Sequence, residues 1–251
     1  MLKVEKLHFA YNTHRGPVLR GADLTLEQGQ IGIVLGKNGS GKTTLFKNIL
    51  GIEKPGSGMI FFDGENLLKM HRRERARRIA YVPQHIHFGD LSVMDSVLMG
   101  RVSYFGMKAG REDYEAVEKI LADMGLMAFA GRSAEALSGG EKQKIAIARA
   151  MAQEPQLMIF DEPTGNLDIA NERLIMEEAR KLAKEKGIAI LSSLHDLNQA
   201  LTFGDKFFFL KNGVVKYAGG REIITADVVK DTFDVDVRIR QIDGQAVVLP
   251  A

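Results

Sequence analysis

Residues 31–50 read IGIVLGKNGSGKTTLFKNIL and carry three structural signals in succession. The apolar run at 31–35 predicts a fully buried strand. Residues 36–41 break that run with three glycines, and helical spacing of apolar residues resumes at 43–50 until Gly51 ends it. Strand, glycine loop and helix, in this order, are the context that a phosphate-binding loop requires.

The glycine loop fits the phosphate-binding pattern of two glycines followed by Lys and Ser or Thr. Backbone N–H groups of such a loop surround a β-phosphate, and the following helix N-terminus adds partial positive charge. Lys42 is then predicted to reach the β- and γ-phosphates, and Thr43 to offer its hydroxyl to Mg²⁺. The flanking strand and helix disfavour the alternative of an ordinary glycine-rich turn. The loop residues predicted to bind the nucleotide are Gly36, Lys37, Asn38, Gly39, Ser40, Gly41, Lys42, Thr43 and Thr44.

A second candidate site follows the apolar run at 157–160, which ends in two carboxylates. Ligands of α/β sheets bind at the carboxyl ends of parallel strands. We expect Asp161 to hold Mg²⁺, directly or through water, and Glu162 to polarise an attacking water or accept its proton. Alone, such a pair is more often a helix N-cap or a solvated loop. Lys42 in the same predicted sheet favours the catalytic interpretation.

The third motif opens the predicted helix after Leu137. Ser138 and Glu141 have the spacing of a capping box. The glycines between them, Gly139 and Gly140, reduce helix stability unless something must approach the backbone closely, and a phosphate is the natural candidate. One chain already devotes Lys42 to the triphosphate. This second anion-binding helix therefore indicates two copies facing head to tail.

The rest of the chain predicts an α/β core with an inserted helical lobe. Strand patterns occupy 2–35, a charged helical pattern covers 67–81, and only helical periodicity is present from 92 to 127. Apolar runs at 157–160 and 188–191 are separated by the amphipathic stretch 171–186, which is the βαβ signature of a parallel sheet. Asn212 and Gly213 predict a hairpin turn, followed by a short helix and terminal strands.

Composition limits the class of protein. The 251 residues are 45% hydrophobic and contain no Cys, which excludes a disulfide scaffold and thiol chemistry. With 34 Lys plus Arg against 32 Asp plus Glu, the charge is nearly balanced, so we expect no nucleic-acid partner. We expect neither a signal peptide nor a membrane span. The basic cluster at 71–78 is interpreted as a solvated helix face, and His85 with His87 as a solvated loop.

The three motifs, in this order and spacing, resemble the nucleotide-binding subunits of ABC transporters over essentially the whole chain. The resemblance implies an α/β fold: a P-loop NTPase core of the ABC ATPase type, with an antiparallel β subdomain and an inserted α-helical subdomain. It makes residues 1–251 a single domain. Within it, about 1–84 and 157–251 form the RecA-like core with the β subdomain, and about 85–156 form the helical subdomain with the signature motif.

The same resemblance implies roles that physical reasoning alone would not single out. Tyr11 stacks on adenine, Gln84 is the Q-loop glutamine near Mg²⁺ and the water, and Asp168 lies in the D-loop that crosses to the partner. His195 is the switch histidine at the γ-phosphate. The implied catalytic residues are Glu162, His195, Lys42 and Gln84; the Mg²⁺ residues are Thr43, Gln84 and Asp161; and the signature residues that reach the partner's ATP are Ser138, Gly139, Gly140 and Glu141.

As a function, the resemblance implies an ATP-hydrolysing importer subunit with ATP and Mg²⁺ as cofactors. Two features resemble the ATPase subunits of importers of iron chelates, haem or cobalamin. They are Lys37, which stands in place of a more frequent Pro, and the segment 92–101. The implied partners are a second copy, an integral membrane permease and a separate substrate-binding protein, with the chain peripheral at the cytoplasmic face of the inner membrane. The alternative is a soluble ABC ATPase, such as one acting in iron–sulfur cluster assembly. A kinase or GTPase would have no use for the Ser138 motif.

Overall fold

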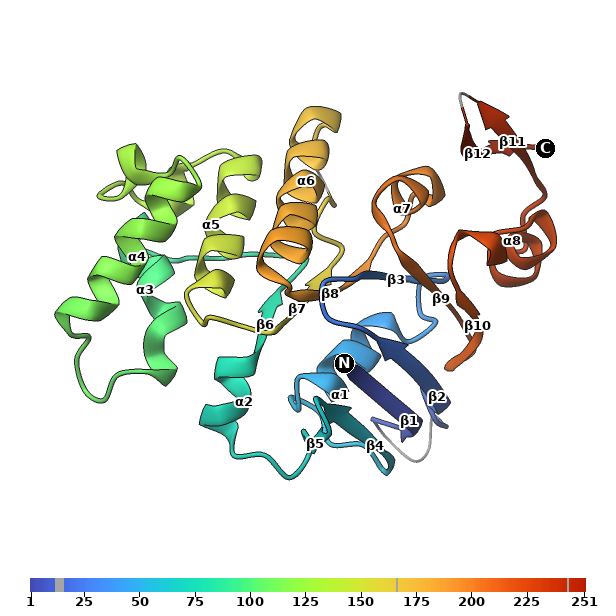
Figure 1. Ribbon diagram of the computed structural model, residues 1–251, viewed down its shortest axis with the longest axis horizontal. Coiled ribbons are helices and arrows are strands. Elements are labelled where there is room, and N and C mark those ends of the chain that lie inside the picture. Colours follow the sequence, from blue (N-terminus) through green and yellow to red (C-terminus); the bar gives the residue numbers. More distant parts are fainter. Residues whose placement is uncertain (12–15, 166, 243) are drawn as a thin grey trace. The chain divides into compact units, whose positions relative to one another are not determined.

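The computed structural model describes residues 1–11, 16–165, 167–242 and 244–251 (Figure 1). These residues form two compact units. The first unit contains Met1–Met70 and Arg180–Ala251, and the second unit contains His71–Ala179. Helix α6 (Ile169–Lys186) begins in the second unit and ends in the first.

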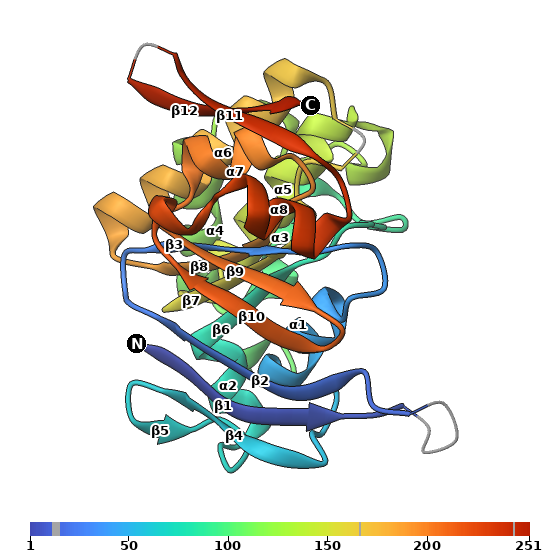
Figure 2. The same cartoon turned by 90° about the vertical axis from the view of Figure 1, so that its right-hand side faces the viewer.

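An antiparallel sheet in the first unit has the strand order β2-β1-β4-β5 (Figure 2). The buried side chains of β1 follow the sequence pattern 2, 4, 7, 9, which contains one residue more than strict alternation allows. The pairing of β1 with β2 accordingly shifts register between Val4 and Leu7, and Lys6 adopts a φ of 44°. A bulge thus keeps both halves of the strand facing the core. The strands are β1 (Leu2–Phe9), β2 (Leu19–Leu26), β4 (Ser57–Phe62) and β5 (Glu65–Asn66).

Four further strands of the first unit lie side by side, and one of them, β3, leads into the glycine loop. All five residues of β3 (Ile31–Leu35) are buried, and β3 pairs in parallel with β8 (Ala189–Ser193) and β9 (Lys206–Lys211). Strand β10 (Val214–Gly219) pairs antiparallel with β9. At the turn between them Asn212 and Gly213 have φ angles of 51° and 79°, as the predicted Asn-Gly hairpin requires. Helix α1 (Lys42–Ile49) follows the glycine loop.

The C-terminal part of the first unit consists of short elements. They are α7 (Leu197–Phe203), the 3₁₀ turn η5 (Arg221–Ile223), α8 (Ala226–Phe233), β11 (Val237–Ile242) and β12 (Gln245–Pro250). Strands β11 and β12 form a separate two-stranded sheet. The side-chain amide of Asn198 on α7 pairs with the backbone of Val248, because its Nδ2 donates to the Val248 carbonyl at 3.0 Å and its Oδ1 accepts from the Val248 N–H at 2.8 Å. The Asn198 side chain thus makes both hydrogen bonds that a neighbouring strand would make with Val248, and it attaches β12 to α7.

The second unit is mainly helical, and the side chain of Arg101 contacts residues from several of its segments. This guanidinium is buried, pairs with Asp113 at 3.1 Å and Glu154 at 2.5 Å, and lies 3.9 Å from the centroid of the Tyr104 ring. A buried cation needs such partners to offset its lost hydration. The elements are α2 (Arg72–Arg78), β6 (Ile79–Val82), α3 (Val93–Leu98), η2 (Met99–Ser103), α4 (Arg111–Asp123), η3 (Met127–Phe129), η4 (Ala134–Ala136), α5 (Gly139–Met151) and β7 (Leu157–Asp161).

The predicted helix at 67–81 is wrong at both ends. Only Arg72–Arg78 is helical, and Ile79–Val82 forms β6, which pairs in parallel with β7 from Ile79 opposite Leu157. The apolar residues at 79–82 gain more from a buried strand than from a helix with no buried face. The basic cluster is also only partly solvated, since Arg73 and Arg77 both donate to the carbonyl oxygen of Ser103 at 3.1 Å.

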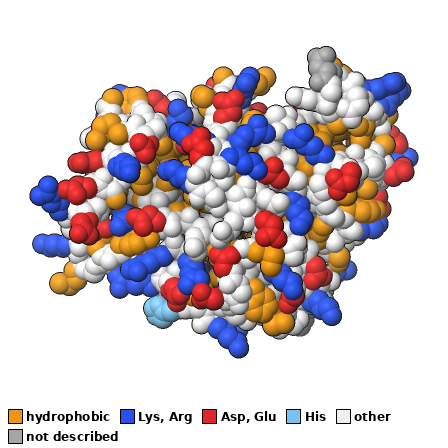
Figure 3. Space-filling view, in the orientation of Figure 1, with side chains coloured by type: hydrophobic (Ala, Val, Ile, Leu, Met, Phe, Trp, Pro, Cys, Tyr) orange, Lys and Arg blue, Asp and Glu red, His pale blue; other side chains and the backbone are white. Residues whose placement is uncertain are grey.

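On the face shown in Figure 3, Lys and Arg side chains are interspersed with Asp and Glu side chains. This mixture agrees with the nearly balanced charge of the sequence. Among the described residues, no helix combines the length and the apolar character that crossing a membrane would require.

Candidate functional site

The glycine loop of the first unit has the backbone geometry of a phosphate cradle. A Cβ at Gly36 would lie 2.3 Å from the carbonyl oxygen of Leu210, so only glycine fits there. Gly39 and Gly41 have positive φ angles of 80° and 109°, which strain other residues. A Cβ at Gly39 would meet no atom of the described residues within 4 Å, so none of them blocks this side of the loop.

Two polar side chains of the loop, Lys42 and Ser40, are buried and can donate hydrogen bonds to a ligand. Lys42 is only 5% exposed, and its ammonium group donates to the carbonyl oxygens of Gly36 at 2.9 Å and Lys37 at 3.4 Å. The Ser40 hydroxyl is buried and has no hydrogen-bond partner among the described residues. Because a buried polar atom without a partner is costly, an acceptor such as a phosphate oxygen fits this position.

A cavity of about 690 Å³ joins this loop to the side chain of Tyr11. Its volume is in the range of nucleotide-sized ligand sites. Tyr11 is 55% exposed, and its hydroxyl lies 3.2 Å from the Thr44 hydroxyl, while its ring packs edge-on against Phe9. The cavity is lined by Tyr11, Gly16, Pro17, Val18, Arg20, Gly39, Ser40, Asn212 and Gly213.

The other predicted residues of the first unit differ in their exposure. Lys37 is exposed and pairs with Asp234 at the end of α8 at 2.5 Å. Asn38 and Thr43 are also exposed, whereas Thr44 is buried. His195 is exposed between β8 and α7, and its neighbour Asp196 caps α7 by accepting from two backbone N–H groups.

In the second unit, the end of β7 brings four polar side chains into two contacts. Asp161 is 3% exposed and accepts a hydrogen bond from the Tyr81 hydroxyl at 3.4 Å. Burial, followed by the charge and hydrogen bond of Asp161, raises the pKa of Tyr81. Glu162, with a positive φ of 51°, accepts from Nε2 of Gln84 at 2.5 Å. Gln84 and Glu162, which were both predicted to act at the reaction centre, are therefore in direct contact. The contact of Tyr81 with Asp161 was not predicted, because no motif in the sequence around Tyr81 indicates it.

The predicted capping box is present at the start of α5. The Glu141 carboxylate accepts from the Ser138 hydroxyl at 2.7 Å and from the Ser138 N–H at 2.8 Å. The hydroxyl bond, followed by the backbone bond, holds the pKa of Glu141 below its usual value. An anionic group at this position also complements the positive end of the helix.

The two glycines of this motif differ in whether the folded chain leaves room for a side chain. A Cβ at Gly140 would lie 2.4 Å from Oδ1 of Asn171, so a side chain of the same unit accounts for this glycine without a phosphate. Among the described residues, a Cβ at Gly139 would meet only Leu167, at 3.5 Å, which is an ordinary contact. The expectation that a ligand approaches the backbone closely therefore depends on Gly139.

Asn171 also connects this helix to Asp168. The Asp168 carboxylate accepts from the backbone N–H and the side-chain amide of Asn171, both at 2.8 Å. The backbone bond, followed by the side-chain bond, lowers the pKa of Asp168. Asn171 was not predicted, because an Asn in the first turn of a helix is common and carries no functional signal.

The candidate Mg²⁺ residues offer a hydroxyl, a carboxylate and an amide, which are the hard oxygen donors that Mg²⁺ prefers. Within the described ranges, no group of three or more His, Cys, Asp or Glu side chains is placed to hold a metal ion. His85 and His87 are exposed and lie outside the helices and strands, as their interpretation as residues of a solvated loop predicts.

Comparison with known proteins identifies the family to which this chain is similar. The sequence pattern of the family described as ABC transporter matches residues 19–165. An uncharacterised ABC transporter ATP-binding protein of Methanocaldococcus jannaschii is 38% identical, and the match covers 100% of this chain and 98% of that protein. The hemin import ATP-binding protein HmuV of Bradyrhizobium diazoefficiens is 34% identical, with 98% and 94% covered. The phosphonates import ATP-binding protein PhnC 2 of a Synechococcus species is 32% identical, with 93% and 90% covered.

Two solved structures are similar along most of the chain. One is a chain from an inward-facing ABC transporter described as metal-chelate type, with a TM-score of 0.83 and 29% identity over 99% of this chain and 95% of that chain. The other is the dimeric ATP-binding cassette MJ0796 in a post-hydrolysis state with ADP and Pi. Its TM-score is 0.77 at 28% identity, with 88% and 98% of the chains covered.

The fold and the loop define a nucleotide hydrolase with a phosphate-binding loop, an antiparallel sheet and a helical region. The chain belongs to the ABC transporter family, as an ATP-binding subunit that couples ATP hydrolysis to transport. The predicted fold class, family and ATPase activity are thereby confirmed. ATP-binding cassettes of this family form dimers and work in complexes with transmembrane subunits.

Proposed function

We propose that this chain is the ATPase subunit of an importer and that the cargo is a metal chelate or haem. The ATPase assignment rests on the loop at 36–44, with its glycine cradle, its buried Lys42 and the Ser40 hydroxyl, which has no partner among the described residues. Support for import comes from relatives whose names are those of importer ATPases. Support for the cargo class comes from the hemin, iron-hydroxamate and enterobactin relatives at 32–34% identity.

A phosphonate cargo is the second candidate, because one of the relatives is named as a phosphonates import ATP-binding protein. The phosphonates relative matches at 32% identity, which equals the identity of the enterobactin relative. Identity at this level therefore weighs little between the two cargo classes. The ATPase subunit itself need not contact the cargo, so the permease that it binds must identify it.

For catalysis, we assign Glu162 as the general base and Gln84 as the residue that orients its carboxylate, in keeping with their contact. Lys42 and the loop N–H groups stabilise charge on the β- and γ-phosphates. Tyr11 supports the adenine next to the loop cavity, and His195 contacts the γ-phosphate. Ser138, Gly139, Gly140 and Asp168 face a second copy of the chain.

Thr43, Asp161 and Gln84 would hold Mg²⁺ together with phosphate oxygens of ATP. When bound, this ion neutralises phosphate charge. In this proposal the subunit works at the cytoplasmic face of the inner membrane, with an integral permease and a separate substrate-binding protein, and residues 85–156 form the helical subdomain. A soluble ABC ATPase acting without a membrane partner is the alternative.

Copurification tests the importer proposal. Tagged Glu162→Gln protein is incubated with ATP, Mg²⁺ and detergent-solubilised membranes of its own cell, and the retained proteins are identified by mass spectrometry. A multi-span permease is expected. Lys42→Ala is the matched control, because without nucleotide it cannot form the ATP-closed state. Retention of soluble proteins alone would replace the importer proposal with the soluble ATPase.

The retained permease then distinguishes the cargoes. Vesicles containing the permease, the wild-type subunit and ATP are tested with a ferric chelate, haemin and a phosphonate, each with the matching binding protein. Uptake of the ferric chelate or haemin supports the proposed cargo. Uptake of the phosphonate alone refutes the cargo and leaves the importer ATPase in place.

A further inference from the structure

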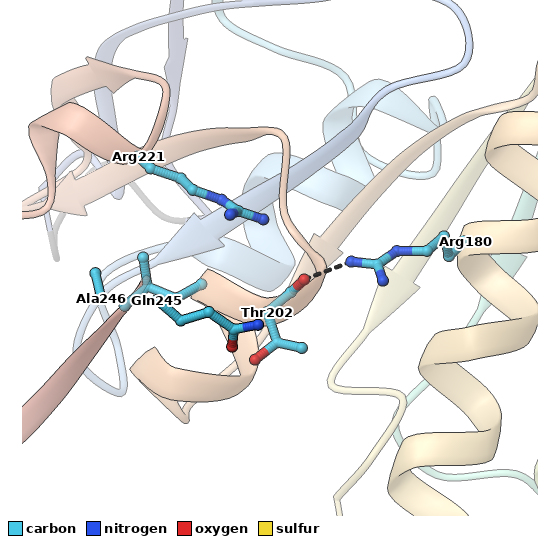
Figure 4. Close-up of a pocket in the computed structure, with 6 residues that line it drawn as sticks. Arg180, Thr202, Arg221, Gln245 and Ala246 are labelled. Atoms are coloured by element: carbon cyan, nitrogen blue, oxygen red, sulfur yellow. Dashed lines mark hydrogen bonds between the residues drawn. The ribbon is translucent and has the colours of Figure 1, made fainter. Parts of the chain in front are cut away.

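A second cavity lies in the first unit, among the C-terminal elements and away from the glycine loop in sequence. Its volume is about 210 Å³, and α6, α7, η5 and β12 each contribute residues (Figure 4). All of these residues belong to Arg180–Ala251 and hence to one compact unit. The lining residues are Arg180, Leu201, Thr202, Arg221, Gln245 and Ala246.

Two arginines give this cavity a concentrated positive charge. In Figure 4 the guanidinium groups of Arg180 and Arg221 extend into the cavity from opposite sides, with the Gln245 side chain below them. Arg180 donates to the carbonyl oxygen of Thr202 and lies 5.0 Å from the centroid of the Phe203 ring. These contacts hold its planar group in one orientation and leave other N–H donors available.

Neither guanidinium is neutralised by the chain in the parts that the structure describes. No ion pair is formed by Arg180 or Arg221 with any described carboxylate. Glu222, the acidic neighbour of Arg221 in sequence, instead accepts from the N–H of Gly220 at 2.7 Å. Asp205, near α7 in sequence, is occupied by Lys184 and the N–H of Ile31. Arg180 and Arg221 are exposed, so water screens their mutual repulsion, and an anion between them would pair with N–H donors that the described part of the chain does not use.

We propose that this cavity is a binding site for a small oxyanion, either a phosphate or a short carboxylate. Guanidinium groups match the planar geometry and charge of both, and the Gln245 amide adds a neutral donor. A water molecule takes about 30 Å³ in the liquid, so the volume admits one oxyanion with a few waters and excludes a nucleotide. The site is separate from the ATP site proposed above and does not depend on the transported cargo.

The position of the site connects it to the switch region. Its donors come from α6, η5 and β12, and β12 is attached to α7 through Asn198 and Val248. Helix α7 begins two residues after His195. An oxyanion shared by these elements would hold the β11–β12 hairpin on α7, so the anion would act as a ligand-dependent clamp at the helix that follows the switch histidine.

Calorimetric titration with inorganic phosphate tests the site. The full chain is first saturated with Mg²⁺ and a non-hydrolysable ATP analogue, so that the glycine loop is filled. We expect millimolar binding to the wild type and at least about tenfold weaker binding to Arg221→Gln, because one charge-assisted pair is lost. Arg240→Gln, an exposed change on the same hairpin, should bind as the wild type does. The same titration with malonate shows whether phosphate or carboxylate is preferred.

Hydrogen exchange supplies a second measurement that does not depend on heat of binding. Phosphate or malonate should slow amide exchange at 245–250 in the wild type and in Arg240→Gln, but not in Arg221→Gln. Two results would overturn the proposal: binding of neither anion up to about 20 mM, or equal affinity in the wild type and Arg221→Gln. Arg180→Gln is avoided as the main variant because Arg180 also packs on Phe203.

Discussion

Lys42 illustrates at the scale of one residue how the loop is prepared for ATP. The residue is buried, and its ammonium group is held by carbonyl oxygens of the loop itself. A desolvated cation is costly without acceptors, and phosphate oxygens are stronger acceptors than carbonyls. The neighbouring Ser40 hydroxyl has no partner in the part of the chain that the structure describes, so a phosphate that binds there would add a hydrogen bond to the loop.

Replacing Lys42 with Ala should therefore weaken ATP binding by about 100-fold or more, since charge-assisted hydrogen bonds contribute about 1.5–3 kcal/mol each. Equilibrium dialysis with labelled ATP measures the change. Lys47→Ala, on the same helix, is the control and should bind ATP normally. Unchanged affinity in Lys42→Ala would show that the lysine is structural.

The capping box of α5 acts at the scale of an element. The Glu141 carboxylate satisfies the backbone N–H of Ser138, and the Ser138 hydroxyl accepts from the N–H of Glu141 at 3.4 Å. Because the pKa of Glu141 is lower in the folded protein than in the unfolded chain, its stabilising effect is present above the ordinary glutamate pKa. The effect is lost as the pH falls through the folded value.

We expect Glu141→Ala to reduce the protection of the first amides of α5 at pH 7 by about 0.5–1 kcal/mol. The difference from the wild type should shrink at pH values below the folded pKa of Glu141. Hydrogen exchange followed by mass spectrometry gives the protection factors. Glu118→Ala, at an exposed position of α4, should show no such pH dependence. A difference that persists at acidic pH would mean that the charge of Glu141 is unimportant.

At the scale of the whole molecule, the start of α5 in one copy is expected to close over the ATP of another. Gly139 is the position where the described residues leave room for this approach, because a Cβ there would meet only Leu167 among them. Loss of a general base lowers a reaction rate by about 10²- to 10⁴-fold without removing substrate contacts. Glu162→Gln should thus bind ATP and accumulate as a closed dimer.

Light scattering after gel filtration tests this expectation. Glu162→Gln with ATP and Mg²⁺ should have twice the mass of the single chain, whereas Glu162→Gln with Gly139→Glu should remain a monomer, because the added carboxylate repels the partner's phosphates. Gly131→Glu is the matched control and should still dimerise, because a Cβ at Gly131 would meet no described residue within 4 Å. A dimer that tolerates Gly139→Glu would contradict the head-to-tail arrangement.

Local sequence patterns determined most elements of this protein. Residues 31–50 predict β3, the glycine loop and α1; Asn212 and Gly213 predict the β9–β10 turn; and Ser138 with Glu141 predicts the cap of α5. These features depend on contacts between residues close in sequence, so a short window contains their cause. The family and the ATPase activity follow from the same motifs.

Tertiary structure decided what distant residues do to one another. The stretch 79–82 is a strand because β7 lies opposite it, and Gly140 is required because Asn171 occupies the space of its Cβ. Gln84 meets Glu162 across 78 positions of sequence. The cavity of Arg180, Arg221 and Gln245 likewise exists only after folding, because burial and electrostatics depend on distance in space, which no local pattern of residue types encodes.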